Sequence, residues 1–368
     1  MKVLFIITRS NNPGGANVHV KDMAKFLKEK NHQVLVLVGG DGEFLKDLEE
    51  LDINYKQIAN LVNAINPIKD SLALLDIYKK IKKFRPDIIS THTSKAGWIG
   101  RIASKLTGTP VVYTPHCFSF LFDESGIKTF LYKWFEKLAV PFTDKLIMVS
   151  QFEYNETLRL KITNEERLIV IQNGMPSIGD KLLANPQKSP PKLVMVARFE
   201  DQKDHFTLIE AIKSLTDLNW DLDLIGDGKN QQEIKRLAKE YEIIDRVSFI
   251  GEVRDVKNYL AESQIFLLIT KWESFPRSIL EAMRAGLPVI ASDVGGINEM
   301  VGDANGALVP KGDIKTLSSE LRELISKPEK RLQKGEKSRQ LYLDNFTFDK
   351  MYIKTLDIYR EVLNRKLI

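Results

Sequence analysis

Two glutamates, Glu273 and Glu281, have the residue type and spacing that suit a site for a hydroxyl-rich ligand. A continuous helix between them would separate their backbones by about 12 Å. One carboxylate could then bind the hydroxyls of a sugar ring and the other those of a ribose, with a diphosphate at the helix N-terminus. The alternative interpretation is a pair of solvated glutamates on an amphipathic helix.

The segment that carries these glutamates lies between two apolar runs, residues 265–270 and 289–292. Both runs have the length and composition of buried strands, which predicts a β-α-β unit. Pro276 fits the first helical turn, where a missing N–H is harmless, and Gly286 fits the position just past the helix end. The glutamates are therefore predicted to lie where a strand passes into a helix.

Other candidate ligand residues also follow predicted strands. After the first strand, residues 2–8, Gly14 and Gly15 let the backbone approach a ligand closely beside a helix N-terminus. After the fifth strand, His116 could hydrogen-bond a substrate hydroxyl or carry a proton. Cys117 invites a Cys–His dyad, but neighbouring side chains in extended chain point apart and no third orienting group is evident. The alternatives are an ordinary glycine loop and a structural histidine.

The second half of the chain repeats this arrangement. Arg198 ends a predicted strand and Lys203 follows five residues later, just before a helix. Two cations near a helix N-terminus suit a diphosphate. Gly228 and Val253 follow the next two strands, where a small residue leaves room for a ligand and an apolar one could line a base pocket. The joint placement at C-terminal strand ends favours a ligand site over ordinary surface.

Composition limits the class of protein. The chain has 368 residues, too many for one ordinary core, and a globular hydrophobic content of 43%. No apolar run approaches the roughly 20 residues that span a bilayer. A single cysteine excludes an internal disulfide and suits a reducing cytosol, so we expect a cytoplasmic protein. The five histidines look scattered, without metal spacing, and we expect no metal ion or other cofactor.

The positive charge is concentrated in the first half of the chain. The net charge is +5, and residues 1–175 contain 24 Lys and Arg against 19 Asp and Glu. The excess is small and no recognised nucleic-acid motif occurs, which argues against a nucleic-acid partner. Candidates for peripheral association with an anionic membrane are basic and aromatic residues at helical spacing: Lys79, Lys80, Lys82, Lys83, Lys128, Lys133 and Trp134. The alternative is packed helices with solvated charged faces.

Apolar strands alternate with helices along both halves of the chain, which predicts doubly wound parallel sheets of the α/β class. The alternation stops in the proline-rich residues 173–191, which read as an interdomain linker. We therefore expect two Rossmann-like domains, residues 1–175 and 176–347, with an interdomain cleft. Ligands of such sheets bind beyond the C-terminal strand ends.

These motifs together resemble those of the family 4 retaining glycosyltransferases. The resemblance rests on the Glu-x7-Glu pair, on Gly286-Leu287-Pro288-Val289-Ile290-Ala291, on Gly295-Gly296-Ile297-Asn298-Glu299, on Arg198 with Lys203, on the Gly14-Gly15 loop and on His116. Residues 91–97 and 116–120 resemble members that build cell-surface polysaccharides. The resemblance covers essentially the whole chain. It implies a GT-B fold, in which the C-terminal helix, about residues 348–368, packs back on the first domain.

The resemblance implies transfer of a hexose from a nucleotide-diphosphate sugar, with a UDP-sugar expected, to a saccharide or lipid-linked saccharide acceptor. The reaction would retain the anomeric configuration and need no metal. His116 and Glu273 would act at the sugar, and Glu281 would bind the ribose. The remaining donor-binding residues implied are Gly14, Gly15, Arg198, Lys203, Gly228, Val253, Ser274, Phe275 and Arg277.

Two other function classes stay open. One is another GT-B enzyme, such as a nucleotide-sugar 2-epimerase, and the other is a non-catalytic nucleotide-sugar-binding protein. The combination of Arg198 and Lys203 with the glutamate pair argues against the first, and the intact set of donor residues argues against the second. A Rossmann oxidoreductase is disfavoured because the GxGxxG fingerprint is missing.

Overall fold

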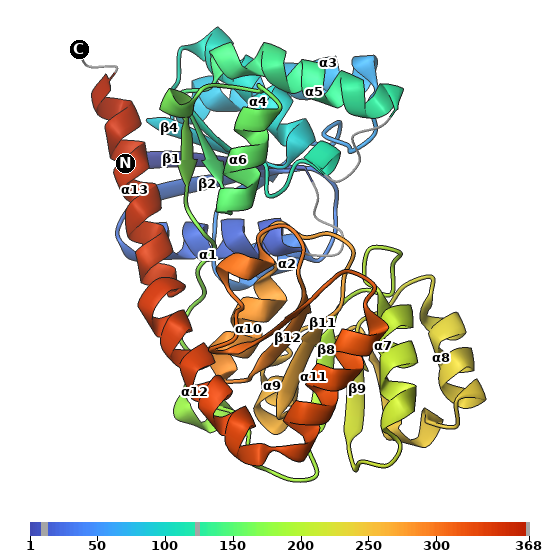
Figure 1. The fold of residues 1–368 in the computed structure, drawn as a ribbon. Helices are drawn as coiled ribbons and strands as arrows, with labels where there is room; N and C mark the ends of the chain where they lie inside the picture. Colours follow the sequence, from blue (N-terminus) through green and yellow to red (C-terminus); the bar gives the residue numbers. More distant parts are fainter. Residues whose placement is uncertain (9–13, 122–125, 366–368) are drawn as a thin grey trace. The chain divides into compact units, whose positions relative to one another are not determined.

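The computed structural model describes residues 1–8, 14–121 and 126–365 and divides into two compact units (Figure 1). Unit 1 comprises Met1–Gln172 and Tyr352–Ile368, and unit 2 comprises Asn173–Met351. Each unit contains one parallel sheet with helices between successive strands. The predicted α/β class with two doubly wound parallel sheets is confirmed.

The sheet of unit 1 has the strand order β3-β2-β1-β4-β5-β6-β7. Its strands are β1 (Lys2–Ile7), β2 (Gln33–Val38), β3 (Tyr55–Gln57), β4 (Ile88–His92), β5 (Val111–Thr114), β6 (Lys145–Met148) and β7 (Leu168–Val170). The order runs outward in both directions from the β1–β4 pair, so it reverses between these two strands. Such a reversal is where open α/β sheets bind ligands.

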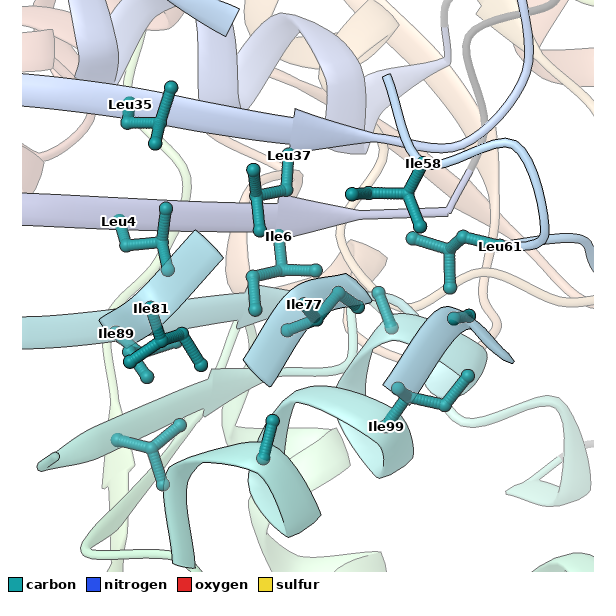
Figure 2. Packing of buried hydrophobic residues seen from close by; sticks show 14 residues of the cluster. Leu4, Ile6, Leu35, Leu37, Ile58, Leu61, Ile77, Ile81, Ile89 and Ile99 are labelled. Atoms are coloured by element: carbon teal, nitrogen blue, oxygen red, sulfur yellow. The ribbon is translucent and has the colours of Figure 1, made fainter. Parts of the chain in front are cut away.

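The helices of unit 1 cover this sheet and bury its apolar side chains. They are α1 (Gly15–Glu29), α2 (Phe44–Glu50), α3 (Pro67–Phe84), α4 (Ser94–Thr107), α5 (Ile127–Ala139) and α6 (Gln151–Arg159). Figure 2 shows one core, in which Leu4 and Ile6 of β1 and Leu37 of β2 meet Ile77 of α3 and Ile99 of α4. Burial on both faces explains why the strands are continuous apolar runs rather than alternating ones.

Unit 2 repeats the plan with six strands in the order β10-β9-β8-β11-β12-β13. They are β8 (Lys192–Val196), β9 (Asp221–Ile225), β10 (Val247–Gly251), β11 (Ile265–Leu268), β12 (Val289–Ser292) and β13 (Gly306–Val309). Its helices are α7 (His205–Ile212), α8 (Gln231–Glu240), α9 (Lys257–Glu262), α10 (Arg277–Ala285), α11 (Ile314–Ser326) and α12 (Pro328–Asn345). Here the strand order reverses between β8 and β11.

The last helix, α13 (Phe348–Arg365), contributes its residues from Tyr352 onward to unit 1. There Tyr352 packs on Phe26 with ring centroids 4.2 Å apart, and Glu361 pairs with Lys145 at 3.3 Å. No helix within the described ranges is both long and apolar enough to cross a bilayer.

The proline-rich segment predicted as a linker is packed against α12 within unit 2. The fully buried guanidinium of Arg331 donates to the carbonyl oxygens of Pro186 at 2.6 Å and Lys188 at 3.0 Å. These bonds supply acceptors to a charge that would otherwise be buried without them. Residues 173–191 therefore belong to the folded body of unit 2.

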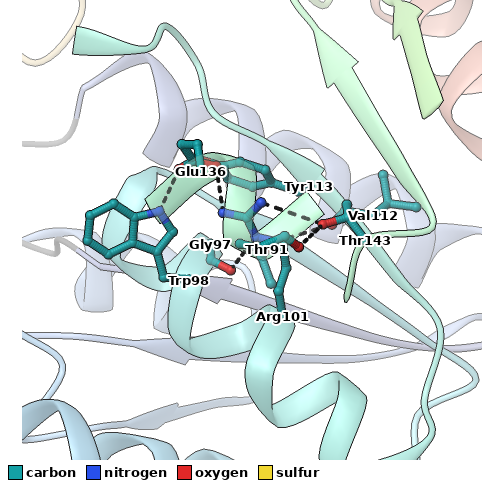
Figure 3. Close-up of polar contacts among 9 residues, drawn as sticks. Thr91, Gly97, Trp98, Arg101, Val112, Tyr113, Glu136 and Thr143 are labelled. Carbon is teal, nitrogen blue, oxygen red and sulfur yellow. Dashed lines mark hydrogen bonds and ion pairs between the residues drawn. The ribbon is translucent and has the colours of Figure 1, made fainter. Parts of the chain in front are cut away.

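A buried ion pair joins α4 to α5 in unit 1 (Figure 3). Arg101 of α4 and Glu136 of α5 meet at 2.7 Å, with side chains 0% and 1% exposed. Trp98 donates to Glu136 at 2.6 Å, Arg101 donates to the Gly97 carbonyl at 2.8 Å, and the guanidinium lies 4.1 Å from the Tyr113 ring. The network fixes α5 to the sheet. Its polar groups can be buried because each has a partner on a neighbouring element.

We predict that Glu136→Ala destabilises the protein by about 3–5 kcal/mol, because it leaves the Arg101 guanidinium buried without its counter-charge. Denaturant unfolding measures the difference. The control is Glu240→Ala, which removes an exposed pair with Arg236 on α8 and should cost far less. Equal effects of the two substitutions would contradict a structural role for the buried pair.

Candidate functional site

The strongest site feature of unit 2 is an ion pair across the reversal of strand order. Lys203, in the loop after β8, pairs with Glu273, in the loop after β11. Gln202 donates to the Glu273 carboxylate at 3.2 Å and to the Trp272 carbonyl at 2.7 Å. The side chains of Lys203 and Glu273 are only 14% and 12% exposed. The structure thus brings together two residues that the sequence predicted to bind different parts of one ligand.

The backbone of these two loops is hydrogen-bonded so that the pair is held in place. The Asp204 amide donates to the Ile269 carbonyl at 2.9 Å, and the Lys271 amide donates to the Gln202 carbonyl at 2.8 Å. Thr270 adds a side-chain bond to the Gln202 carbonyl at 3.0 Å. The two charged side chains are therefore positioned by the sheet edge rather than by flexible loops.

Gly295 lies directly against the backbone of Glu273. Its φ is +59°, and a Cβ at this position would fall 1.7 Å from the Glu273 carbonyl oxygen. Only glycine tolerates both the backbone conformation and the close approach. The Gly295-Gly296 part of the motif thus has a physical role, which is to let the loop after β12 support the glutamate.

Helix α10 begins one residue later than predicted. Pro276 is the N-cap in extended conformation and Arg277 is the first helical residue, because Pro276 has ψ 123°, outside the helical range. Gly286 ends the helix at φ +81°, as predicted. Glu281 is a half-buried side chain of this helix. Burial raises its pKa, and Arg277 and Arg284 oppose this rise.

The other donor candidates of unit 2 follow the strands β8, β9, β10 and β11. Arg198 is exposed after β8. Gly228 has φ +151°, and a Cβ there would fall 2.5 Å from the Phe199 carbonyl oxygen, so it packs against the same loop. Val253 is half-buried after β10, in the stretch before Asp255, which acts electrostatically on Glu281. Ser274 and Phe275 are buried.

The buried Phe275 side chain packs on Phe346, with ring centroids 5.7 Å apart. It belongs to the core of unit 2, so Phe275 can offer a ligand its backbone only.

In unit 1, the predicted residues gather at the reversal between β1 and β4. Gly14 and Gly15 are exposed at the start of α1, although residues 9–13 of the preceding loop lie outside the described residues. His116 follows β5, and its Nε2 lies 2.9 Å from Nδ1 of His92, the last residue of β4. Burial and the nearby His19 hold the pKa of His92 well below its usual range, so His92 is neutral.

The prediction that the histidines are scattered is wrong for three of the five. His19, His92 and His116 come together in unit 1, because parallel strands bring their C-terminal ends to one edge. The other two, His32 and His205, lie elsewhere. His205 stacks on Phe199 at 4.2 Å between centroids, and burial lowers its pKa to about 4.

The loop that carries His116 is strained and is held by a buried glutamate. His116 and Cys117 have φ of +57° and +97°, which residues with a Cβ rarely adopt. The Glu153 carboxylate accepts from the amides of Cys117 at 3.0 Å, Phe118 at 3.2 Å and Val149 at 3.1 Å. Glu153 is fully buried and positions this loop.

Two residues of the site, Glu153 and Gln202, were missed by the sequence reasoning, as was the role of Gly295 in supporting Glu273. A signal existed for Glu153, because Ser150-x-x-Glu153 is a capping-box pattern, and Ser150 does accept from the Glu153 amide at 3.1 Å. The partners of Gln202 and Gly295 depend on which strands are neighbours, and spacing along the chain does not reveal them.

The membrane candidates lie on α3 and α5. Those with exposed side chains are Lys79, Lys82, Lys83 and Trp134. Lys80 and Lys133 are half-buried, and Lys80 pairs with Asp76 at 3.7 Å. The side chain of Lys128 lies outside the described residues.

Comparison with protein families matches both halves of the chain. The model described as "Glycosyl transferases group 1" matches residues 183–341, and the model described as "Glycosyltransferase Family 4" matches residues 13–177. Together the two matches include every candidate donor-binding residue, from Gly14 to Glu281.

Relatives and solved structures agree with these matches. The UDP-Gal:alpha-D-GlcNAc-diphosphoundecaprenol alpha-1,3-galactosyltransferase of Escherichia coli is 29% identical over 327 residues, which are 84% of either chain. A glycosyltransferase structure from Rickettsia africae ESF-5 superposes with a TM-score of 0.85 at 22% identity, covering 98% of both chains. The Anabaena protein Alr3699/HepE, solved with UDP-glucose, gives 0.83 at 22% identity, covering 98% of this chain and 100% of that one.

We predict that Gly295→Ala lowers stability by at least about 2 kcal/mol, because the new methyl group collides with the Glu273 carbonyl in a strained backbone conformation. Thermal unfolding measures the change. Gly302→Ala in the same unit is the matched control, since a Cβ there would meet nothing within 4 Å. A variant as stable as the control would mean that Gly295 does not support Glu273.

Proposed function

Since the chain belongs to the family 4 glycosyltransferases, with a GT-B fold of two Rossmann-like domains, we propose that it transfers a hexose from a UDP-sugar to a saccharide or lipid-linked saccharide. The name of the Escherichia coli relative supports this choice, because that enzyme uses UDP-galactose and a diphosphoundecaprenol-linked sugar. The Anabaena structure with bound UDP-glucose supports a UDP-sugar donor. The proposed context is synthesis of a cell-surface polysaccharide.

The observation that carries this proposal is the Lys203–Glu273 pair at the sheet edge of unit 2. Lys203 supplies a cation for phosphate, and Glu273 next to it supplies a carboxylate for sugar hydroxyls. A nucleotide-diphosphate sugar has these two groups on either side of the bond that breaks in transfer. Without a ligand the two charges neutralise each other. A bound donor would give Lys203 a diphosphate and Glu273 a hydroxyl group, so neither charge would be left buried without a partner.

The nucleoside end of the donor is assigned to α10 and its neighbours. Glu281 would accept hydrogen bonds from the ribose hydroxyls, and its half-buried position favours such a partner over water. Arg198 and the amides at the start of α10 would add positive potential for the diphosphate. Val253 and Gly228 would line the rest of the surface that binds the nucleoside.

The proposed chemistry is retaining and independent of metal. The bond between the anomeric carbon and the diphosphate oxygen breaks, and its electron pair leaves with UDP. The acceptor hydroxyl oxygen bonds the same face of the sugar, and its proton passes to the departing phosphate oxygen. Lys203, Arg198 and helix amides would stabilise the charge on the leaving group. His116 would contact the transferred sugar, and the Gly14-Gly15 amides would contact phosphate.

Exposed apolar side chains on unit 1 support a membrane-bound setting for this reaction. On α5, Phe130 is 67% exposed and Trp134 47%, and Leu131, Phe135 and Leu138 are also exposed. The outward face of α5 is therefore largely apolar, in contrast to the solvated charged face considered as the alternative. On α3, exposed Ile68, Leu72 and Leu75 precede Lys79 and Lys82 at helical spacing along one face.

Helix α4 packs against both α3 and α5, so these faces belong to one helical layer, seen together in Figure 1. We propose that this layer rests on an anionic membrane, with apolar side chains among the acyl chains and lysines at the headgroups. A lipid-linked acceptor would then reach the enzyme from the same surface.

We predict that Glu281→Ala weakens UDP binding about 10–100-fold, because it removes charge-assisted hydrogen bonds to the ribose. Isothermal titration calorimetry with UDP, in the presence of a chelator, measures the affinity. Glu240→Ala, on exposed α8 of the same unit, should bind UDP like the parent. If Glu281→Ala bound UDP with unchanged affinity, the assignment of Glu281 to the ribose would be wrong.

We predict that Trp134→Glu combined with Leu72→Glu reduces binding to anionic phosphatidylglycerol vesicles at least 10-fold, since charges on an apolar face cannot enter the acyl region. Co-sedimentation at low salt measures the bound fraction. The control is Leu343→Glu, at an exposed apolar site of unit 2. The membrane assignment would be contradicted if the double variant bound vesicles as well as the control does. It would also be contradicted if the parent protein did not bind the vesicles.

A further inference from the structure

Three imidazole rings form a compact cluster at the edge of the unit 1 sheet. His19 lies in α1, His92 is the last residue of β4, and His116 follows β5. The ring centroids are 5.4 Å apart for His19 and His92, 4.9 Å for His19 and His116, and 5.1 Å for His92 and His116. Three separate elements thus converge on one point.

The nitrogen atoms of these rings lie at distances that suit a shared ligand. One ring nitrogen of each histidine lies within 4.8 Å of the other two. Zinc binds histidine nitrogen at about 2.0–2.1 Å, which in tetrahedral geometry separates two ligand nitrogens by about 3.3 Å. Nδ1 of His92 and Nε2 of His116 are already 2.9 Å apart. Ring rotations that bring each pair of nitrogens to this spacing would let all three bind one ion.

His92 is already oriented by its surroundings. Its Nε2 lies 3.0 Å from the Ser90 hydroxyl, within hydrogen-bonding distance. A histidine that binds a metal almost always uses its second ring nitrogen in such a contact, which fixes the ring and its tautomer. Nδ1 of His92 therefore faces the cluster as a preset ligand.

We propose that His19, His92 and His116 form a binding site for one divalent cation of the zinc class. Three imidazoles suit zinc, cobalt, nickel and copper better than magnesium or calcium, which prefer oxygen. The cluster contains no carboxylate from the described residues. The half-exposed His116 leaves a side open for a water molecule as the fourth ligand.

Binding needs a change of tautomer and no net loss of a ring proton. The hydrogen bond between His92 and His116 holds one proton on one of the two facing nitrogens. When the metal takes both lone pairs, this proton moves to the other nitrogen of the same ring. If the protonated ring is that of His92, the proton moves to its Nε2, which then donates to the Ser90 hydroxyl oxygen 3.0 Å away.

The consequence for transfer rests on the proposed function of His116. A metal-bound His116 is withdrawn from the sugar, so zinc should inhibit an enzyme whose chemistry needs no metal. The site is therefore inhibitory rather than catalytic.

Zinc binding to the full chain is measured by competition with a chromophoric zinc chelator. We expect one Zn²⁺ per chain. His92→Gln and the half-exposed His116→Gln should each weaken binding by more than about 100-fold, and Ser90→Ala by about 10–100-fold. His32→Gln, a histidine outside the cluster, should bind like the parent. Melting temperatures without metal confirm that each variant is folded.

The absence of stoichiometric binding by the parent, or equal binding by all the variants, would overturn the proposal. Transfer assays then separate the two claims. Zinc inhibition that a chelator reverses supports both the site and the role of His116. Zinc binding without inhibition would keep the site and contradict the role of His116 in transfer.

Discussion

Lys203 and Glu273 join two loops that leave the unit 2 sheet where its strand order reverses. Both side chains are largely withdrawn from water, so each charge is tolerated because the other is beside it. Neighbouring residues support this contact. Gln202 donates a hydrogen bond to the Glu273 carboxylate, and Gly295 has no side chain that would collide with the Glu273 backbone. A ligand that approaches this edge must satisfy both charges at once. The proposed donor, which has a diphosphate next to sugar hydroxyl groups, would meet this requirement.

The corresponding edge of unit 1 carries imidazole rings where unit 2 carries the Lys203–Glu273 pair. His92 and His116 share a hydrogen bond, and the buried Glu153 holds the strained loop that presents His116. Rigid support of this kind is expected where a side chain must meet a ligand with a defined tautomer. The same rigidity would suit the metal site that we propose for His19, His92 and His116. Under the two proposals above, metal binding and sugar binding would compete for the side chain of His116.

The strands and most helices could be predicted from the sequence because buried parallel strands are continuous apolar runs. Residues 34–38 and 289–292 are examples. The placement of Lys203 and Glu273 after strands was also readable, but their contact was not, because it depends on β8 and β11 being neighbours. The histidine cluster was missed for the same reason, since its members lie far apart in the chain. The Arg101–Glu136 pair was not identified from the sequence, because only the packing of α4 on α5 shows that both side chains are buried.

The central claim is that the edge of unit 2 binds a UDP-sugar without metal. A thermal-shift screen of the full chain against nucleotide sugars and free nucleotides, with a chelator present, tests it most directly. At about 100 times the dissociation constant, a ligand of the native state adds about 2.7 kcal/mol of stability. We predict a higher melting temperature with UDP and with at least one UDP-hexose. No shift with any of these, together with a shift from NAD or a free sugar, would contradict the account.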